Sequence, residues 1–273
     1  MPGFLTFLAP IGVVHLILGT AGLAIFPMPL GTEATTLAVA VGSSVLRVAA
    51  VLLMLGTMRT EEVSRVIPVT HTFPIFVAIL AVPLLGEDLS GLDWLAIMMT
   101  VSGAVSISVR WDSTGKRLSL SRSFALLMLS SILFGVANIG SKYAMEQISF
   151  WNMYAVNAAC LGAVSLMISL RPRTLRNLRD MPGRELALGL ILFNECLSVI
   201  GFALSFWAID EGPVSLVSTI LSTRPAFIFI YVVGLSRFFP AVLGERLSRG
   251  IVAAKVASIG LIIGGVALLT TAG

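Results

Sequence analysis

The sequence predicts an all-α integral membrane protein with about nine transmembrane helices, arranged as two related halves of inverted topology. Three observations predict this fold class: the apolar composition, the distribution of positive charge among the loops, and a motif that occurs twice. Hydrophobic residues make up 57% of the 273 residues and charged residues 12%, and the mean hydropathy is +0.98. A soluble domain is roughly a quarter charged. Because one globule of this length cannot bury so much apolar surface, we expect lipid to surround it.

Nine apolar segments have about the 20 residues that a helix needs to cross a bilayer. Gly, Pro and charged residues separate them, as is typical of turns. The first segment has no Lys or Arg ahead of it and is too long for a signal-peptide core, so we interpret it as a spanning helix. The segments are approximately residues 4–27, 36–58, 64–85, 91–110, 123–145, 150–170, 185–208, 213–236 and 250–271.

Positive charge is concentrated in alternate loops. The loops at 59–65, 110–122, 171–184 and 237–249 contain 14 Lys and Arg residues, whereas the other loops contain one, Lys142. Cytoplasmic loops are enriched in cations, so we expect a multi-pass protein of the cell membrane with its N-terminus in the cytoplasm and its C-terminus outside. The same bias explains the net charge of +4 without any nucleic-acid partner.

A repeated motif relates the two halves. Residues 63–74 and 214–225 share Val, Ser, Val, Thr and Pro at matching positions, 151 residues apart. Each block is followed by Gly-Glu-x-Leu-Ser, at 86–90 and at 244–248, whose acids we expect to be solvated or to cap the next helix. The blocks lie five predicted helices apart, and an odd offset inverts one copy relative to the other. Inverted repeats are typical of secondary carriers, whose site lies near the membrane midplane.

Two stretches, residues 74–87 and 225–245, each precede a Gly-rich last helix, and a third pattern runs from Phe134-Gly135 to Lys142. These features resemble EamA-type carriers of the drug/metabolite transporter superfamily. The resemblance covers most of the chain and implies a ten-helix carrier fold, of which this sequence lacks the first helix, the counterpart of 123–145. Either the protein is a natural nine-helix variant, or its start was assigned too late. It also implies a secondary transporter that moves a small polar metabolite by alternating access, with export as the favoured direction. Ten-helix members have both ends in the cytoplasm, unlike the orientation predicted above.

The repeat and the resemblance together divide the chain into three parts. Residues 1–110 are predicted to form the first repeat, with four helices, and residues 123–273 the second, with five. Residues 111–122 are predicted to be a cytoplasmic linker.

Four ionisable residues inside predicted spans stand out: Arg47, His71, Glu195 and Arg224. A charged group at the centre of a membrane helix costs about 2.5–3.5 kcal/mol on insertion scales, so each needs a partner or a water-filled cavity. Glu195 is predicted either to take a coupling proton or to pair with one of the two arginines. The arginines are predicted to hold an anionic substrate group or to act as internal partners. His71, like His15, is a proton switch or, more commonly, an interhelical hydrogen-bonding group.

Polar residues near these charges complete the predicted substrate path. Pro74 and Pro225 are predicted helix breaks, because proline removes a backbone donor and frees a carbonyl. Membrane helices also use single polar groups to hold helices together. The uncharged candidates for substrate binding are Thr72, Asn138, Asn157 and Asn194, with Thr70, Ser222 and Thr223 as further polar groups nearby.

The sequence contains no catalytic, cofactor-binding or metal-binding motif, so we expect no enzyme, no cofactor and no metal. Cys160 and Cys196 lie in apolar segments as packing residues, and Gly260 with Gly264 predicts close packing, either within the bundle or between two copies. The expected partners are the lipid bilayer, a small-molecule substrate and a coupling proton. Two alternatives stay open: an intramembrane enzyme acting on a lipid-linked substrate, and a non-transporting membrane subunit.

Overall fold

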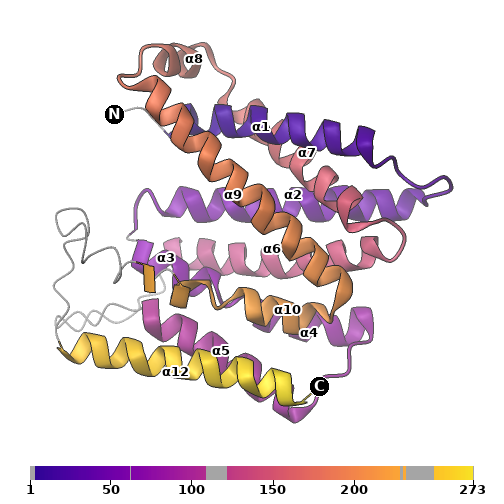
Figure 1. Ribbon diagram of the computed structural model, residues 1–273, viewed down its shortest axis with the longest axis vertical. Helices are drawn as coiled ribbons and strands as arrows, with labels where there is room; N and C mark the ends of the chain where they lie inside the picture. The colour runs from indigo at the N-terminus through magenta and orange to yellow at the C-terminus, as the bar shows by residue number, and fades with distance from the viewer. Residues whose placement is uncertain (1–3, 62, 109–121, 228–229, 232–248, 273) are drawn as a thin grey trace. The chain divides into compact units, whose positions relative to one another are not determined.

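The computed structural model describes residues 4–61, 63–108, 122–227, 230–231 and 249–272, and all regular structure within them is helical (Figure 1). The fold is therefore all-α over the described residues. The helices are α1 (Phe4–Ile25), α2 (Ala34–Thr57), α3 (Val63–Thr70), α4 (Phe73–Leu85), α5 (Gly91–Ser108), α6 (Arg122–Met145), α7 (Phe150–Ser169), α8 (Pro172–Arg179), α9 (Arg184–Glu211), α10 (Val214–Leu221) and α12 (Arg249–Ala272).

The helices include five that are long and apolar enough to cross a membrane, namely α1, α2, α6, α7 and α9. Shorter apolar helical stretches are α4 itself (Phe73–Leu85), Gly91–Ser106 within α5, and Val256–Leu269 within α12. The chain is thus a multi-pass membrane protein, while the count of nine spanning helices stays a prediction. One predicted span, 64–85, consists of two shorter helices, and part of another, 213–236, lies outside the described residues.

The loop predicted at 171–184 contains a short helix, α8, that hydropathy did not reveal. It begins at Pro172, where a missing amide costs nothing, and it carries Arg176 and Arg179 in its last turn. Cations at that end are favourable for the helix dipole. Thr174 is buried, and the arginines of α8 are exposed.

The chain forms two compact units, Met1–Val48 with Gly140–Glu211, and Ala49–Ile139 with Gly212–Gly273. It passes from one unit to the other inside α2, inside α6, and between α9 and α10. Each unit therefore contains segments from both halves of the sequence. Residues of one repeat and of the other build a common core within each unit.

In the first unit, α1 lies directly against α7 through small residues. A Cβ atom on Gly19 would lie 2.3 Å from the backbone nitrogen of Ala159, and one on Gly162 would lie 2.4 Å from that of Leu16. Only glycine permits two helices to approach so closely, which is how membrane helices gain van der Waals contact without a hydrophobic driving force. At one end of the pair, Asn152 donates a hydrogen bond of 2.6 Å to the carbonyl of Phe26.

In the second unit, α5 and α12 approach each other in the same way. A Cβ atom on Gly103 would lie 2.7 Å from the carbonyl oxygen of Ser258, and one on Gly265 would lie 2.8 Å from that of Ala96. Of the predicted glycine pair, a Cβ atom on Gly264 would lie 3.3 Å from the end of the Met99 side chain of α5. A Cβ atom on Gly260 would have no such neighbour within 4 Å. In the same unit α4 packs against α10.

Two of these pairings join corresponding helices of the two repeats. By the offset of the repeated motif, α1 corresponds to α7, α5 to α12 and α3 to α10. The contacts of α1 with α7 and of α5 with α12 are the most extensive between helices of the described residues, whereas α4 packs against the counterpart of its neighbour α3. A twofold relation between inverted repeats brings equivalent elements face to face, so the pairing supports the repeat that the sequence predicts.

Changing Gly19 to Ala should lower the thermal unfolding midpoint in detergent, because the new methyl group would overlap the α7 backbone. Overpacking of this kind costs about 1–3 kcal/mol. Gly42→Ala is the matched control, since no atom lies within 4 Å of a Cβ there and alanine is the better helix former. Equal midpoints for the two variants would contradict the close contact of α1 with α7.

Candidate functional site

Two helices are broken at equivalent positions of the two repeats, both in the second unit. In the first repeat, α3 ends at Thr70 and α4 begins at Phe73. In the second repeat, α10 ends at Leu221, two turn residues follow, and residues 224–227 are helical again. The second piece of each broken helix has proline at its second residue, Pro74 in one and Pro225 in the other. Proline is tolerated there because the first amides of a helix have no intrahelical acceptor.

The threonines at the two breaks make the same hydrogen bond. Thr72 donates to the carbonyl of Val69 at 2.7 Å, and Thr223 donates to the carbonyl of Ile220 at 2.7 Å. The last carbonyls of a helix lack intrahelical partners, and an unpaired carbonyl in lipid costs free energy. Each of these carbonyls also accepts from the backbone amide of the same threonine, so the hydroxyl adds a second hydrogen bond at the break. The Thr72 hydroxyl also lies 3.0 Å from that of Ser131 on α6.

Three further predicted site residues of this unit, Asn138, His71 and Arg224, lie at the breaks or on a helix beside them. Asn138 on α6 is buried and donates to the Ser218 hydroxyl of α10 at 3.3 Å. His71 is half-buried, and its ring centroid lies 6.4 Å from that of Phe73. Arg224 is exposed and lies within electrostatic range of His71. The breaks thus bring hydroxyl, amide and cationic side chains together in the second unit.

Glu195 is the buried acid of the first unit, and its ion-pair partner is His15. The carboxylate lies on α9, and its Oε2 is 3.4 Å from Nδ1 of His15 on α1. Asn194 donates to the other carboxylate oxygen at 3.2 Å. The same Nδ1 lies 3.1 Å from the carbonyl of Ile11, so the geometry favours a hydrogen on this ring nitrogen. Sequence reasoning named Arg47 or Arg224 as the partner, and the structure replaces them with a histidine.

Arg47 is buried on α2 and contacts two other helices of the first unit. Its Nη2 donates to the Ser141 hydroxyl at 3.0 Å, and its guanidinium carbon lies 5.0 Å from the ring centroid of Phe206. A cation over an aromatic face is stabilised by the ring quadrupole. The contacts therefore hold the guanidinium in a fixed place within an apolar bundle.

Asn157 and Tyr154 lie one turn apart on α7, and both side chains are more than nine-tenths buried. The Oδ1 atom of Asn157 and the hydroxyl of Tyr154 have no hydrogen-bond partner among the described residues. The Glu195 carboxylate lies within electrostatic range of the Tyr154 phenol. A buried polar atom without a partner is costly and marks a place where water or a ligand is expected.

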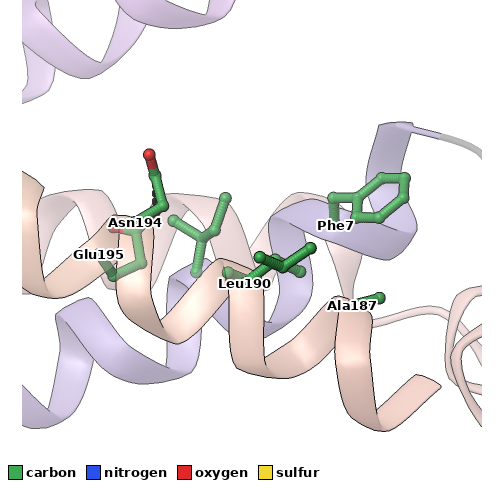
Figure 2. A pocket seen from close by; sticks show the side chains of 7 residues that line it. Phe7, Ala187, Leu190, Asn194 and Glu195 are labelled. Carbon is green, nitrogen blue, oxygen red and sulfur yellow. Dashed lines mark hydrogen bonds between the residues drawn. The ribbon is translucent and has the colours of Figure 1, made fainter. Parts of the chain in front are cut away.

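A pocket of about 300 Å³ opens between α1 and α9 in the first unit. Figure 2 shows Asn194 and Glu195 at one end of it and Phe7 with Ala187 at the other. Its volume is at the lower end of the range of small-molecule sites. The lining is apolar except at the end with the carboxylate and the amide, and consists of Phe7, Ile11, Ala187, Leu190, Ile191, Asn194 and Glu195.

Sequence reasoning missed the role of Glu87. Its carboxylate accepts hydrogen bonds from the amides of Val214 and Ser215 and from the Ser215 hydroxyl, so it caps α10. Of the two expectations for this acid, the one that it caps the next helix is wrong, because α5 has its own cap, in which Ser90 and Asp93 bond each other reciprocally. The signal was present: the Gly-Glu motif recurs together with the Val-Ser pair. The second copy, 244–248, lies outside the described residues.

Lys142, the one cation predicted in an outside loop, also caps a helix. Its ammonium donates to the carbonyls of Ile209 and Asp210, each at 2.8 Å, at the C-terminal end of α9. A cation at this end complements the helix dipole and pairs carbonyls that have no intrahelical donor. Lys142 departs from the predicted bias of positive charge among the loops, and its capping of α9 gives a structural reason for its position.

Comparison with known proteins identifies the fold and the family. The model of the EamA-like transporter family matches residues 3–109 and 122–271. A solved structure, titled only as the crystal structure of a protein, is similar over 100% of this chain and 90% of its own, with a TM-score of 0.67 and 14% identity. At that identity the likeness shows the fold alone. No curated protein matches the chain.

A double-mutant cycle should reveal coupling between His15 and Glu195. We expect His15→Gln and Glu195→Gln each to lower the thermal midpoint, because each leaves a buried polar group without its partner. The double variant should be less destabilised than the sum, by an interaction energy of about 0.5–3 kcal/mol. Glu185→Gln is the control, since Glu185 is an exposed acid on the same helix, and it should add independently to His15→Gln. Additive effects of the first pair would contradict the ion pair.

Proposed function

The chain belongs to the EamA-like transporter family, and on that premise we propose that it is a secondary transporter that moves a small polar metabolite across the cell membrane by alternating access, in the direction of export. The observation that carries the proposal is the pair of equivalent helix breaks. Carriers built from inverted repeats bind substrate at discontinuous helices, where half-helix ends and unwound backbone offer hydrogen bonds within the membrane.

The residues at the breaks support a substrate with an anionic group. Arg224 is exposed at the start of the second helical piece, and its planar guanidinium is suited to a carboxylate or phosphate. At the other break α4 begins, and the amides of a helix N-terminus carry partial positive charge. In the proposed mechanism Arg224 engages the anionic group in the second unit, where Thr72, His71 and Asn138 offer polar contacts. Arg47 and Asn157 are proposed as polar groups of the substrate path in the first unit.

Glu195 is the proposed carrier of a coupling proton. Its carboxylate is buried in a spanning helix, with a histidine and an amide beside it. A buried carboxylate in such surroundings is costly when charged, so binding a proton is one way to neutralise it. His15 lies on α1 and Glu195 on α9. A proton taken up by the carboxylate would therefore change the interaction that joins these two helices. Protonation would thereby be linked to a change of conformation.

The proposed motion of the repeats and the proposed orientation in the membrane are the ones that the sequence predicts. The two repeats, 1–110 and 123–273, would exchange between inward-open and outward-open arrangements. Of the linker 111–122 between them, only Arg122 lies within the described residues. The concentration of positive charge in alternate loops supports a cytoplasmic N-terminus and a C-terminus outside. Conformational exchange of one repeat relative to the other is the usual basis of alternating access.

A thermal-shift screen followed by flux measurements tests this function. Purified protein is mixed with amino acids, nucleobases, sugars and amines, because a ligand that binds the native state raises the unfolding midpoint. Compounds that do so are then loaded into proteoliposomes, and flux is followed with and without a pH gradient. We expect at least one polar compound to be carried, and to be carried faster with the gradient. Absence of flux for every stabilising compound would refute the transporter.

Replacing Glu195 by Gln should separate coupling from transport. We expect flux driven by the pH gradient to fall at least about tenfold, within the range typical of coupling free energies, while substrate-for-substrate exchange continues. Glu185→Gln on the same helix is the matched control and should behave as the unmodified protein. If Glu195→Gln keeps full gradient-driven flux, the coupling role is wrong.

A further inference from the structure

The first amides of α10 depend on a side chain far away in the sequence. The residue before α10 is Pro213, whose side chain cannot accept a hydrogen bond, and it makes no capping contact. Glu87, 127 residues away, accepts from the Val214 amide, and its second oxygen accepts from the Ser215 amide at 3.3 Å and from the Ser215 hydroxyl. A carboxylate at a helix N-terminus pairs free amides and interacts favourably with the dipole. One charged group therefore holds this end of α10.

Glu87 is placed by the end of α4. Gly86 ends that helix in a left-handed conformation, with φ of 66°, and its amide bonds the carbonyl of Ala81. Glycine adopts this conformation without steric cost, and the chain then turns so that the next residue leaves the helix. Glu87 follows directly, and α4 packs against α10 in the same unit. The Gly-Glu pair thus joins the last turn of one broken helix to the first turn of the other.

The Gly212-Pro213 turn joins the end of α9 to the start of α10, and the end of α9 is capped by a different side chain. Lys142 bonds the last carbonyls of α9, at Ile209 and Asp210. Between the two capped helix ends lie Gly212 and Pro213, at the point where the chain passes from one compact unit to the other. Loss of the Glu87 contact would therefore free the start of α10 while α9 keeps its own cap.

From this arrangement we propose that Glu87 is a latch. Its carboxylate fastens the first turn of α10 to the end of α4, and release of these hydrogen bonds lets α10 move relative to α4 about the Gly212-Pro213 turn. The role in the transport cycle rests on the proposed function, since opening of a broken helix is what exposes the site to one side. The latch itself is a property of the second unit and needs no substrate.

Hydrogen exchange followed by mass spectrometry tests the latch on the purified full-length chain. In Glu87→Gln we expect amides of residues 214–221 to exchange at least ~10-fold faster, because charge-assisted hydrogen bonds are replaced by weaker neutral ones. Amides of α5 and α9 should exchange as before, and the thermal midpoint should stay within a few degrees. Asp88→Asn, a change of the exposed neighbouring acid, should leave α10 unaffected.

A second variant separates a latch from a general loss of stability. Ser215→Ala removes one of the three contacts, and we expect it to accelerate exchange in α10 less than Glu87→Gln does, and to add less in the double variant than it does alone. Unchanged exchange of α10 in Glu87→Gln would overturn the latch, and so would acceleration spread evenly over all helices. The measurement needs no substrate, so absence of flux would refute the transporter without deciding the latch.

Discussion

Every backbone amide and carbonyl inside a bilayer needs a hydrogen-bond partner, and the rest of this structure depends on that constraint. A continuous helix meets the constraint by itself, except at its ends. Two helices broken near Pro74 and Pro225 add ends that lie within the chain's apolar segments. The fold answers with side chains: Thr72 and Thr223 bond carbonyls at the breaks, Glu87 bonds amides of α10, and Lys142 bonds carbonyls of α9. Breaks of this kind persist only where such partners exist.

Buried charge is handled by the same rule. Glu195 has His15 and Asn194, and Arg47 has Ser141 and the face of Phe206. These contacts lower the cost of keeping ionisable groups among apolar helices. Close helix contacts through glycine, such as Gly19 against Ala159, make the surrounding bundle tight enough to hold those geometries. A carrier needs buried charges that have partners in the membrane, and it needs those partners to be exchangeable during the transport cycle.

Much of the architecture could be predicted because its signals are local. Apolar segments, the loop charge bias and the motif around Pro74 and Pro225 are each readable over short windows, and the family match agrees with them. The partner of Glu195 could not be predicted, since it depends on which helix packs against α9, and hydropathy is silent on packing. The eight-residue pieces α3 and α10 merged with their neighbours into single apolar segments. The α10 cap was missed because it joins residues 127 apart.

Site-specific labelling at the two breaks tests the central claim most directly. Single cysteines replace Thr72 or Thr223 in a background of Cys160→Ala and Cys196→Ala, and a thiol reagent that cannot cross the membrane is applied to either side of oriented proteoliposomes. The account predicts that both positions react from each side in turn, and that a transported compound shifts the ratio between the sides. Reaction from one side only, under all conditions, would contradict alternating access at the broken helices.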